Sequence, residues 1–462
     1  MLEAIMPATA EREPVVLILD PDAVYGADLI DYYFVEHGLR SVLGFTEKNA
    51  RRMAFADVPQ AHSRAVAARM DLSLDPATDA GRLNGFDVRA VPAYQEPFVI
   101  YAAHLLELLG VAWNPPEVVA RFRDKFALKE YVRSHDPSVR MNASCRVGSV
   151  GEVLEQAQSE QYRRFVLKPA DGMGNADILL CPEGPDEVTL ERHFQRCVPA
   201  GRTCVMEEFL DGEEYYVDGQ VDGDGVVTPI AIQLYRRGTV GDRSNIALGH
   251  RTIRPDEEHF DALFDYARGV IGATGLVRSP FHMEIKVDDR GPCMIECGAR
   301  LVGWAAGLED SAAHGRQLDV VRVAGHYWLR SDHIDIPLDF THYLSRHGVH
   351  VIGNTLESGV AAAVHGVGRM EADPAFYRWV RKPRVGRSVE PTISTETILW
   401  GVHLVSADKS ELDAAAQWAL RNIVVDVVPA NSPKGRFAKL LNLAHHARRA
   451  ARSSTRGLLM YR

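Results

Sequence analysis

The sequence predicts a protein of mixed α/β and α+β architecture, assembled from several domains. Its 462 residues are enough for about two to four domains of ordinary size. Over the first 115 residues, short apolar runs alternate with amphipathic helical patterns, which is typical of an open, Rossmann-like α/β domain. Further along, runs with apolar–polar alternation are joined by short turns, which indicates antiparallel sheet.

The predicted N-terminal domain covers residues 1–115. Its first strand, Pro14 to Asp20, is apolar up to the final aspartate and suits a buried parallel strand. Gly38 is placed to end a helix that runs from Ala27 to His37, because glycine readily adopts the left-handed conformation that closes helices. We also expect strands at Arg40 to Phe45 and Val88 to Val91, and a helix from Pro97 to Leu109 closed by Gly110.

The predicted central domain covers residues 116–335. A charged helix from Glu117 to His135 opens it and contains Lys125, which by itself is an ordinary surface lysine. A strand from Arg164 to Lys168 then runs into the glycine-rich segment PADGMGNAD. A strand-end lysine followed by glycines is a common way to hold polyphosphate, because backbone N–H groups can approach the anion. The same residues also make plain turns, so this motif alone leaves both interpretations open.

Later elements of the central domain follow simple patterns. We expect a strand from Arg202 to Phe209, a hairpin turning at Asp222 to Gly225, and a helix from Glu257 to Gly272. The segment Ser244 to Pro255 reads as a loop and carries His250, and a lone loop histidine is usually incidental.

A hairpin from Phe281 to Cys297 is the most informative stretch. Two alternating runs flank the turn at Asp288 to Gly291, and a loop centred on Arg290 places Glu284 directly opposite Glu296. Like charges in facing positions are destabilising, so two carboxylates here call for a cation, and oxygen ligands suit Mg²⁺. A solvated strand face is the alternative. The same alternation places Cys293, Ile295 and Cys297 together on the apolar face.

The predicted C-terminal α+β domain covers residues 336–462. Strands at Gly359 to Val364 and Thr397 to Val405 precede a helix from Ser410 to Asn422. The tail carries basic residues and no acids, which indicates a solvated amphipathic helix or, as the less favoured interpretation, a surface for an anionic partner. These basic residues are Lys434, Arg436, Lys439, Arg448, Arg449, Arg452 and Arg456.

Composition narrows the functional classes. The net charge of −10 and the pI near 6.0 argue against nucleic acid or an anionic membrane as the main partner. The N-terminus lacks the pattern of a signal peptide, and no apolar run is long enough to span a bilayer. The six cysteines form no CxxC pair, so we expect buried thiols in the reducing cytoplasm. The sequence contains no GxxxxGK[ST], GxSxG or HExxH motif, and Gly172 and Gly174 lack the third glycine of a dinucleotide fingerprint.

The order of the motifs resembles the ATP-grasp superfamily from about residue 90 to 335. It begins with Arg-Asp-Lys125 and the Lys168 glycine loop, continues through Glu-Glu-Phe-Leu-Asp-Gly-Glu-Glu214 and Gly-His250, and ends with Glu284 and Glu296-Cys-Gly-Ala-Arg300. Within the superfamily the sequence is most similar to the bacterial L-amino acid ligases, which are dipeptide synthetases, because of Gly-His250 and of ECGAR followed by Gly-Trp. The resemblance implies an ATP-grasp fold with a mobile lid at about residues 140–210, and an ATP-dependent carboxylate–amine ligase.

The resemblance also implies roles for individual residues. Glu284 and Glu296 would hold two Mg²⁺ ions on the ATP triphosphate, and Arg300 and His250 would steady the acyl phosphate and the tetrahedral intermediate. Glu207 would accept a hydrogen bond from the adenine amino group, and Glu214 would bind the ribose. The remaining ATP-binding positions are Lys125, Lys168, Gly172, Met173, Gly174, Glu208, Phe209 and Leu210.

Two positions depart from the usual family pattern. Many ATP-grasp enzymes have asparagine two residues after the second glutamate, where this chain has Gly298. The glycine loop has Asn175-Ala-Asp in place of the more usual serine and glycine. Both departures bear on how the metal and the phosphates are held.

The substrates stay open at this stage. Trp304 either narrows the pocket of the carboxylate-donating amino acid or is an ordinary core residue. The implied partners are ATP and amino acids, with neither nucleic acid nor membrane, and a homodimer is compatible with the resemblance, as is a role in antibiotic biosynthesis. The rivals are an ATP-grasp ligase or carboxylase for a non-amino-acid carboxylate or bicarbonate, and a catalytically silent nucleotide-binding protein.

Overall fold

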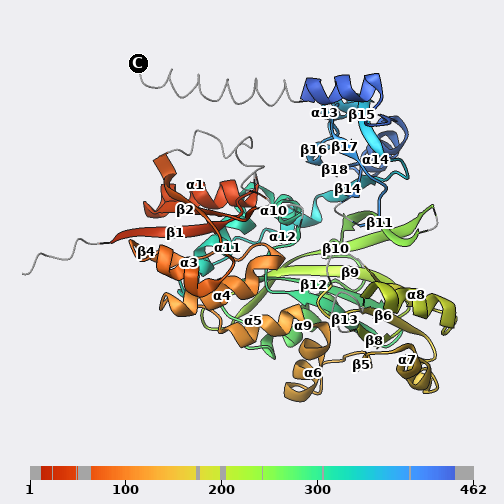
Figure 1. The fold of residues 1–462 in the computed structure, drawn as a ribbon, viewed down its shortest axis with the longest axis horizontal. Helices are drawn as coiled ribbons and strands as arrows, with labels where there is room; N and C mark the ends of the chain where they lie inside the picture. The colour runs from red at the N-terminus through yellow and green to blue at the C-terminus, as the bar shows by residue number, and fades with distance from the viewer. Residues whose placement is uncertain are drawn as a thin grey trace, which may run out of the picture.

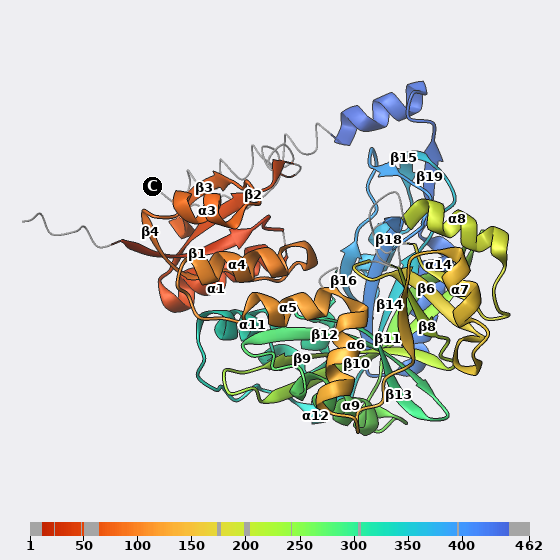
Figure 2. The same cartoon turned by 60° about the horizontal axis from the view of Figure 1, so that its bottom comes forward.

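The computed structural model describes residues 12–22, 24–47, 49, 64–172, 177–197, 204–241, 243–303, 306–394 and 397–442. Figures 1 and 2 show the N-terminal elements on one side of the molecule and the small sheet of β5 to β8 on another, with the longest sheet between them. None of the helices in these ranges is long and apolar enough to cross a membrane.

The N-terminal elements form a parallel sheet of four strands in the order β3-β2-β1-β4. Their bounds are close to those expected, and Gly38, with a φ of 65°, ends α1 as predicted. The elements are β1 (Glu13–Leu19), α1 (Tyr25–His37), β2 (Arg40–Phe45), β3 (Val66–Asp71), α3 (Pro76–Arg82), β4 (Phe86–Ala90), η2 (Glu96–Phe98) and α4 (Val99–Leu108).

A small antiparallel sheet lies within the predicted lid. Its strands follow the order β5-β8-β6-β7, and α7 and α8 pack on one face over an apolar core that includes Phe165, Leu167 and Met206. Alternate residues of β6 and β8, including Lys168 and Glu207, therefore point to the opposite face. The elements are β5 (Ser144–Val147), α7 (Val150–Gln156), η3 (Glu160–Tyr162), β6 (Phe165–Pro169), β7 (Leu179–Cys181), α8 (Glu187–Cys197) and β8 (Cys204–Glu208).

The longest sheet has eight strands in the order β13-β12-β9-β10-β11-β14-β18-β16. Strands β14, β16 and β18 come from the region after residue 336 and extend the sheet that β9 to β13 begin. The strands are β9 (Glu213–Val221), β10 (Val227–Val240), β11 (Arg243–Thr252), β12 (Ser279–Asp288), β13 (Gly291–Gly298), β14 (His347–Gly353), β16 (Phe376–Arg381) and β18 (Trp400–Ser406). A smaller sheet holds β15 (Gly359–Val364), β17 (Ser388–Val389) and β19 (Val425–Val428).

The remaining helices cover these sheets and connect them to the N-terminal part. Helix α11 packs against α1, where the Tyr33 hydroxyl donates to the carbonyl of Gly325. This contact belongs to one continuous apolar core that joins the N-terminal sheet to the eight-stranded sheet. The helices are α5 (Pro116–Arg123), α6 (Lys125–His135), α9 (Phe260–Gly272), α10 (Gly307–Ala313), η5 (Gly315–Gln317), α11 (Val320–Leu329), α12 (Phe340–Leu344), α13 (Val367–Glu371) and α14 (Lys409–Asn422).

Two predicted elements differ from the structure. The single helix expected from Glu117 to His135 is two helices, because Asp124 adopts an extended conformation and its side chain caps the start of α6. The segment expected as a loop around His250 is strand β11, paired with β10 and β14. Register shifts and Gly249, with a φ of 146°, interrupt its apolar–polar alternation, so the local pattern hides a strand that its neighbours hold in place.

Candidate active site

Glu284 and Glu296 face each other across the hairpin of β12 and β13, as predicted. They are paired directly in the antiparallel register, and a β-bulge next to them pairs Ile285 with Met294. The bulge corrects one detail of the prediction, because Met294 rather than Ile295 packs in the core. An extra residue in one strand reverses the faces of the residues beyond it.

Each glutamate has a different neighbour. The ammonium group of Lys125 lies 2.9 Å from Oε2 of Glu296, and His282 lies beside Glu284. Burial raises the pKa of Glu284, but the hydrogen bond from His282 and nearby positive charge outweigh this effect and lower the pKa to about 2. Glu284 is therefore ionised at neutral pH.

The pair suits a magnesium ion on chemical grounds. It offers only carboxylate oxygens, and Mg²⁺ is usually bound through one or two carboxylates together with substrate phosphates. Gly298, which stands where many ATP-grasp enzymes have asparagine, adds no side chain to these possible metal ligands. A Cβ at that position would lie 3.0 Å from Oε2 of Glu96 and 3.4 Å from the side chain of Arg300, so glycine makes room for these two groups.

Lys125 and Lys168 approach the hairpin from two elements. Lys125 begins α6 and donates to the carbonyl of Gly172 at 2.6 Å, while Lys168 ends β6 and donates to the carbonyl of Ile295 at 3.4 Å. Burial lowers the pKa of Lys125, but Glu296 outweighs this effect and raises it. The two predicted phosphate-binding lysines thus contact neighbouring residues of β13, Glu296 and Ile295.

A third lysine, Lys129, was not singled out from the sequence. Its side chain is fully buried, and its ammonium group lies 2.7 Å from Oε2 of Glu207 and 2.8 Å from Oδ1 of Asn142. Burial lowers the pKa of Lys129 to about 8. Its spacing of four residues from Lys125 places both on one face of α6, which is the signal that could have revealed it.

Glu207 is buried between two lysines. Its Oε2 atom lies 3.0 Å from Lys168 as well as 2.7 Å from Lys129. Burial raises the pKa of Glu207, but these two ammonium groups outweigh it and lower the pKa to about 2. The other oxygen, Oε1, is buried and has no hydrogen-bond partner within the described part of the chain. An ionised carboxylate with one unused oxygen is suited to accept a hydrogen bond from a donor such as an amino group.

The two residues after Glu207 contact the small sheet of β5 to β8 and the β12–β13 hairpin. Glu208 accepts a hydrogen bond from Arg290 at 2.6 Å and another from the backbone N–H of Ala143 at 3.2 Å. The backbone N–H of Phe209 donates to the carbonyl of Arg164 at 3.1 Å, and the Arg164 guanidinium lies over the Phe209 ring at 4.6 Å. These contacts join β8 to the ends of β6 and the hairpin.

Leu210 and Glu214 lie at the junction with β9. The carbonyl of Leu210 accepts a hydrogen bond from Lys286 at 3.1 Å. Glu214 forms an ion pair with Arg237, and burial raises its pKa. Binding a ribose, as predicted, would place the sugar beside this ion pair.

Arg300 is held by a residue of the N-terminal part. Its Nε atom donates to Oε2 of Glu96, and Nη1 of Arg123 donates to the other oxygen of Glu96 at 2.6 Å. Burial raises the pKa of Glu96, but the two guanidinium groups outweigh it and lower the pKa. The sequence offered no local signal for Glu96, because its partner Arg300 is 204 residues away.

His250 lies at the centre of a buried group on β11. Its Nε2 atom is hydrogen-bonded to Oε2 of Glu309, and its ring lies 4.7 Å from the ring of His350. Burial lowers the pKa of His250 to about 3, so the ring is neutral at neutral pH. A neutral ring that donates from Nε2 to a carboxylate leaves Nδ1 free to accept a proton. Neither Glu309 nor His350 was identified from the sequence.

Five of the residues described above line one cavity of about 130 Å³: the glutamate pair, Arg300, His250 and His350. Its wall also includes Tyr216, Tyr235, Arg237 and His282, and apolar side chains complete it. A more polar cavity of about 420 Å³ lies around β15 and β17 and contains none of the predicted site residues. The structure therefore gathers the predicted metal and catalytic residues at the smaller cavity.

Three predicted site residues lie outside the described residues. They are Met173 and Gly174 of the glycine loop, and Trp304 of the predicted substrate pocket. Their neighbours are described: Gly172 accepts from Lys125, and Gly303 lines the cavity. Residues 443–462, with most of the basic tail, also lie outside.

Residues 164–307 match the family model of the ATP-grasp domain. The chain contains an ATP-grasp domain. Among solved structures, it is similar to L-amino acid ligase from Bacillus licheniformis, with a TM-score of 0.69 and 15% identity over 90% of this chain and 100% of that one. It is also similar to biotin carboxylase from Campylobacter jejuni, with a TM-score of 0.63 and 13% identity over 91% and 93% of the two chains. These likenesses confirm the predicted fold class.

Curated relatives match part of the chain at low identity. Dapdiamide A synthase from Enterobacter agglomerans is 24% identical over 48% of this chain and 53% of its own length. Glutathione synthetase from Pseudomonas aeruginosa is 26% identical over 36% of this chain and 50% of its own length. The chain thus spans about half the length of these curated relatives.

The matched ATP-grasp region contains some, but not all, of the side chains described above. Lys168, Glu207, His250, the glutamate pair and Arg300 lie inside residues 164–307. Lys125, Lys129 and Glu96 precede the match, and Glu309 and His350 follow it. The ATP-grasp domain is therefore completed by side chains from both flanking regions.

Proposed function

We propose that the chain is an ATP-dependent ligase that joins the carboxylate of an amino acid to an amine, which is a second amino acid. The reaction passes through an acyl phosphate and releases ADP and phosphate. The observation that carries this proposal is one cavity lined by two facing carboxylates, a fixed guanidinium and a neutral histidine, with the ammonium group of Lys125 paired to one of the carboxylates. These are the groups needed for phosphoryl transfer and then acyl transfer.

In the first step, a carboxylate oxygen of the amino acid attacks the γ-phosphorus of ATP, and the bond to the ADP oxygen breaks. Lys125 and Lys168 stabilise the charge on the phosphate oxygens. To reach these oxygens, the ammonium group of Lys125 moves away from the carboxylate of Glu296. Glu284 and Glu296 would hold Mg²⁺, which when bound neutralises charge on the triphosphate. Glu207 accepts from the adenine amino group through its unused oxygen.

In the second step, the amine nitrogen attacks the acyl carbon, and phosphate leaves with the electrons of the carbon–oxygen bond. The nitrogen loses one proton as the amide forms. Arg300, held by Glu96, stabilises the negative oxygen of the tetrahedral intermediate. The departing phosphate can take this proton, and Nδ1 of the neutral His250 ring is suited to accept a hydrogen bond from the reacting groups.

The second candidate is an ATP-grasp ligase or carboxylase that acts on a non-amino-acid carboxylate or on bicarbonate. The likeness to biotin carboxylase favours it at the level of the fold, because its TM-score is close to that for the L-amino acid ligase. The apolar part of the cavity wall argues against bicarbonate, which has no apolar group to place there, but not against other carboxylates.

A screen of ADP release over pairs of amino acids, with mass spectrometry of the products, tests the proposal. We expect a dipeptide product and no ADP release by Glu296→Ala. Glu258→Ala is the control, because Glu258 has a side chain that is 87% exposed and lies on the loop before α9. ADP release only with bicarbonate or with acids that lack an amino group would favour the second candidate. Unchanged release by Glu296→Ala would contradict the site.

A further inference from the structure

Within the described ranges, two groups of three side chains bring histidine, cysteine or carboxylate ligand atoms within 4.8 Å of one another. One is His250, Glu309 and His350 at the cavity. The other lies in the lid and consists of His193, Cys197 and Cys204. The second group, called the lid cluster below, has no part in the proposed ligase reaction.

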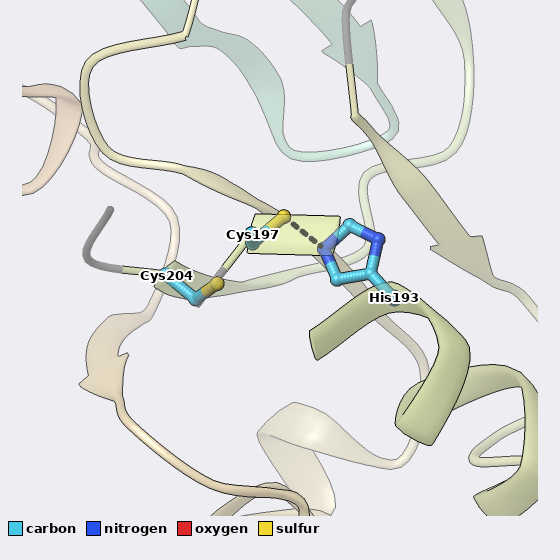
Figure 3. A group of neighbouring side chains, drawn as sticks. All are labelled: His193, Cys197 and Cys204. Atoms are coloured by element: carbon cyan, nitrogen blue, oxygen red, sulfur yellow. Dashed lines mark hydrogen bonds between the residues drawn. The ribbon is translucent and has the colours of Figure 1, made fainter. Parts of the chain in front are cut away.

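Secondary structure brings the lid cluster together. His193 and Cys197 are four residues apart on α8 and therefore share one face of the helix, and Cys204 begins β8, on which this face packs. Figure 3 shows the imidazole and the two thiols directed toward one another. All three are buried, with exposures of 1%, 0% and 1%.

The spacing of the ligand atoms suits a tetrahedral metal ion. Zinc binds thiolate sulfur at about 2.3 Å and imidazole nitrogen at about 2.0–2.1 Å, so such ligands at a tetrahedral angle lie about 3.6 Å apart. The distance from Nε2 of His193 to Sγ of Cys197 is 3.5 Å. Cysteine and histidine are preferred ligands of zinc, whereas magnesium prefers oxygen ligands.

The surroundings of His193 also favour a ligand. The ring is packed among the apolar side chains of the lid core, where its polar contacts are Cys197 at 3.5 Å and Arg196 at 3.4 Å.

We propose that His193, Cys197 and Cys204 form a structural binding site for a thiophilic divalent cation, Zn²⁺, inside the lid. Three protein ligands leave one tetrahedral position for water or another side chain. The ion ties α8 to β8, three residues before Glu207 on the same strand. It therefore stabilises the sheet that carries Lys168 and Glu207, whatever reaction the cavity catalyses.

Cobalt binding to the full-length, reduced protein tests this site, because Co²⁺ bound by thiolates gives charge-transfer and tetrahedral visible absorption. We expect one equivalent of Co²⁺ with these bands, displaced by Zn²⁺ but not by excess Mg²⁺. The double variant Cys197→Ser with Cys204→Ser should lose the bands. Cys181→Ser is the matched control, since Cys181 is another buried thiol of the same lid core and should leave them unchanged.

A second measurement needs no variant and so does not depend on the folding of one. Cys197 and Cys204 are buried and react with an alkylating reagent only when the structure opens transiently, so Zn²⁺ should slow their alkylation in mild urea, as read by peptide mapping, while Cys145 reacts equally with and without the metal. Absence of stoichiometric cobalt bands in the folded wild type would overturn the proposal. Equal cobalt bands in the double variant would also overturn it. So would a Cys197–Cys204 disulfide, if its reduction gave a protein that binds no metal.

Discussion

The guanidinium group of Arg300 is hydrogen-bonded to the carboxylate of Glu96, 204 residues earlier in the chain. The bond joins the end of the β12–β13 hairpin to η2 in the N-terminal part. Glu96 also binds Arg123, so one buried carboxylate holds two guanidinium groups. Gly298 leaves the space in which Glu96 and Arg300 meet. The orientation of the proposed oxyanion-binding group therefore depends on the N-terminal domain.

Replacing Glu96 with glutamine should lower kcat about 100-fold, because small displacements of a catalytic group have effects of this size. The KM for ATP should change little, since Glu96 holds Arg300 rather than the lysines. Steady-state ADP release measures both quantities. Glu13→Gln is the control, because it makes the same change in a different glutamate–arginine pair, Glu13 with Arg40, which lies in the N-terminal sheet. An unchanged kcat in Glu96→Gln would show that Arg300 does not need this anchor.

Glu309→Gln should reduce kcat while the protein stays folded. The variant keeps the shape of the side chain but removes the carboxylate that accepts from Nε2 of His250, so the ring loses its fixed tautomer. We expect a decrease of about 10- to 100-fold with no change in the KM for ATP. Thermal unfolding of both proteins checks the fold. A rise in the KM for ATP at constant kcat would instead place Glu309 in nucleotide binding.

The buried group of Lys129, Glu207 and Lys168 predicts an order of stabilities. Glu207→Gln leaves two buried ammonium groups without their shared counter-charge. Removing one partner of a buried ion pair lowers the free energy of unfolding by about 3–5 kcal/mol. Lys129→Met leaves Glu207 paired with Lys168 and should cost less. Urea unfolding of the three proteins measures the free energies. The reverse order would mean that Glu207 is not the charge that holds these lysines.

The same group predicts how stability changes in acid. The pKa of Glu207 is about 2 in the folded protein and 4.5 ordinarily, so below pH 4.5 the unfolded chain binds the proton first. The stabilisation by Glu207 is therefore complete above pH 4.5 and is lost as the pH falls through 2. The difference in unfolding free energy between wild type and Glu207→Gln should shrink over this range. A constant difference from pH 5 to pH 2.5 would contradict the assignment.

The sequence by itself determined the features that depend on neighbours along the chain. Strand β2, the end of α1 at Gly38 and the facing of Glu284 and Glu296 all follow from local periodicity and turn residues. The order of the motifs was enough to indicate the ATP-grasp fold, which the comparisons confirm. These features are predictable because each is set by interactions within one or two adjacent elements.

Only the tertiary structure decided which distant groups complete the site. Glu96 beside Arg300, Glu309 beside His250 and the burial of Lys129 against Glu207 join segments far apart in the sequence. Strand β11 was read as a loop because its bulges disrupt the alternation, yet β10 and β14 supply its hydrogen bonds. In each case the stabilising partner comes from another element, and the energy of such a contact depends on how the elements pack, which local spacing does not encode.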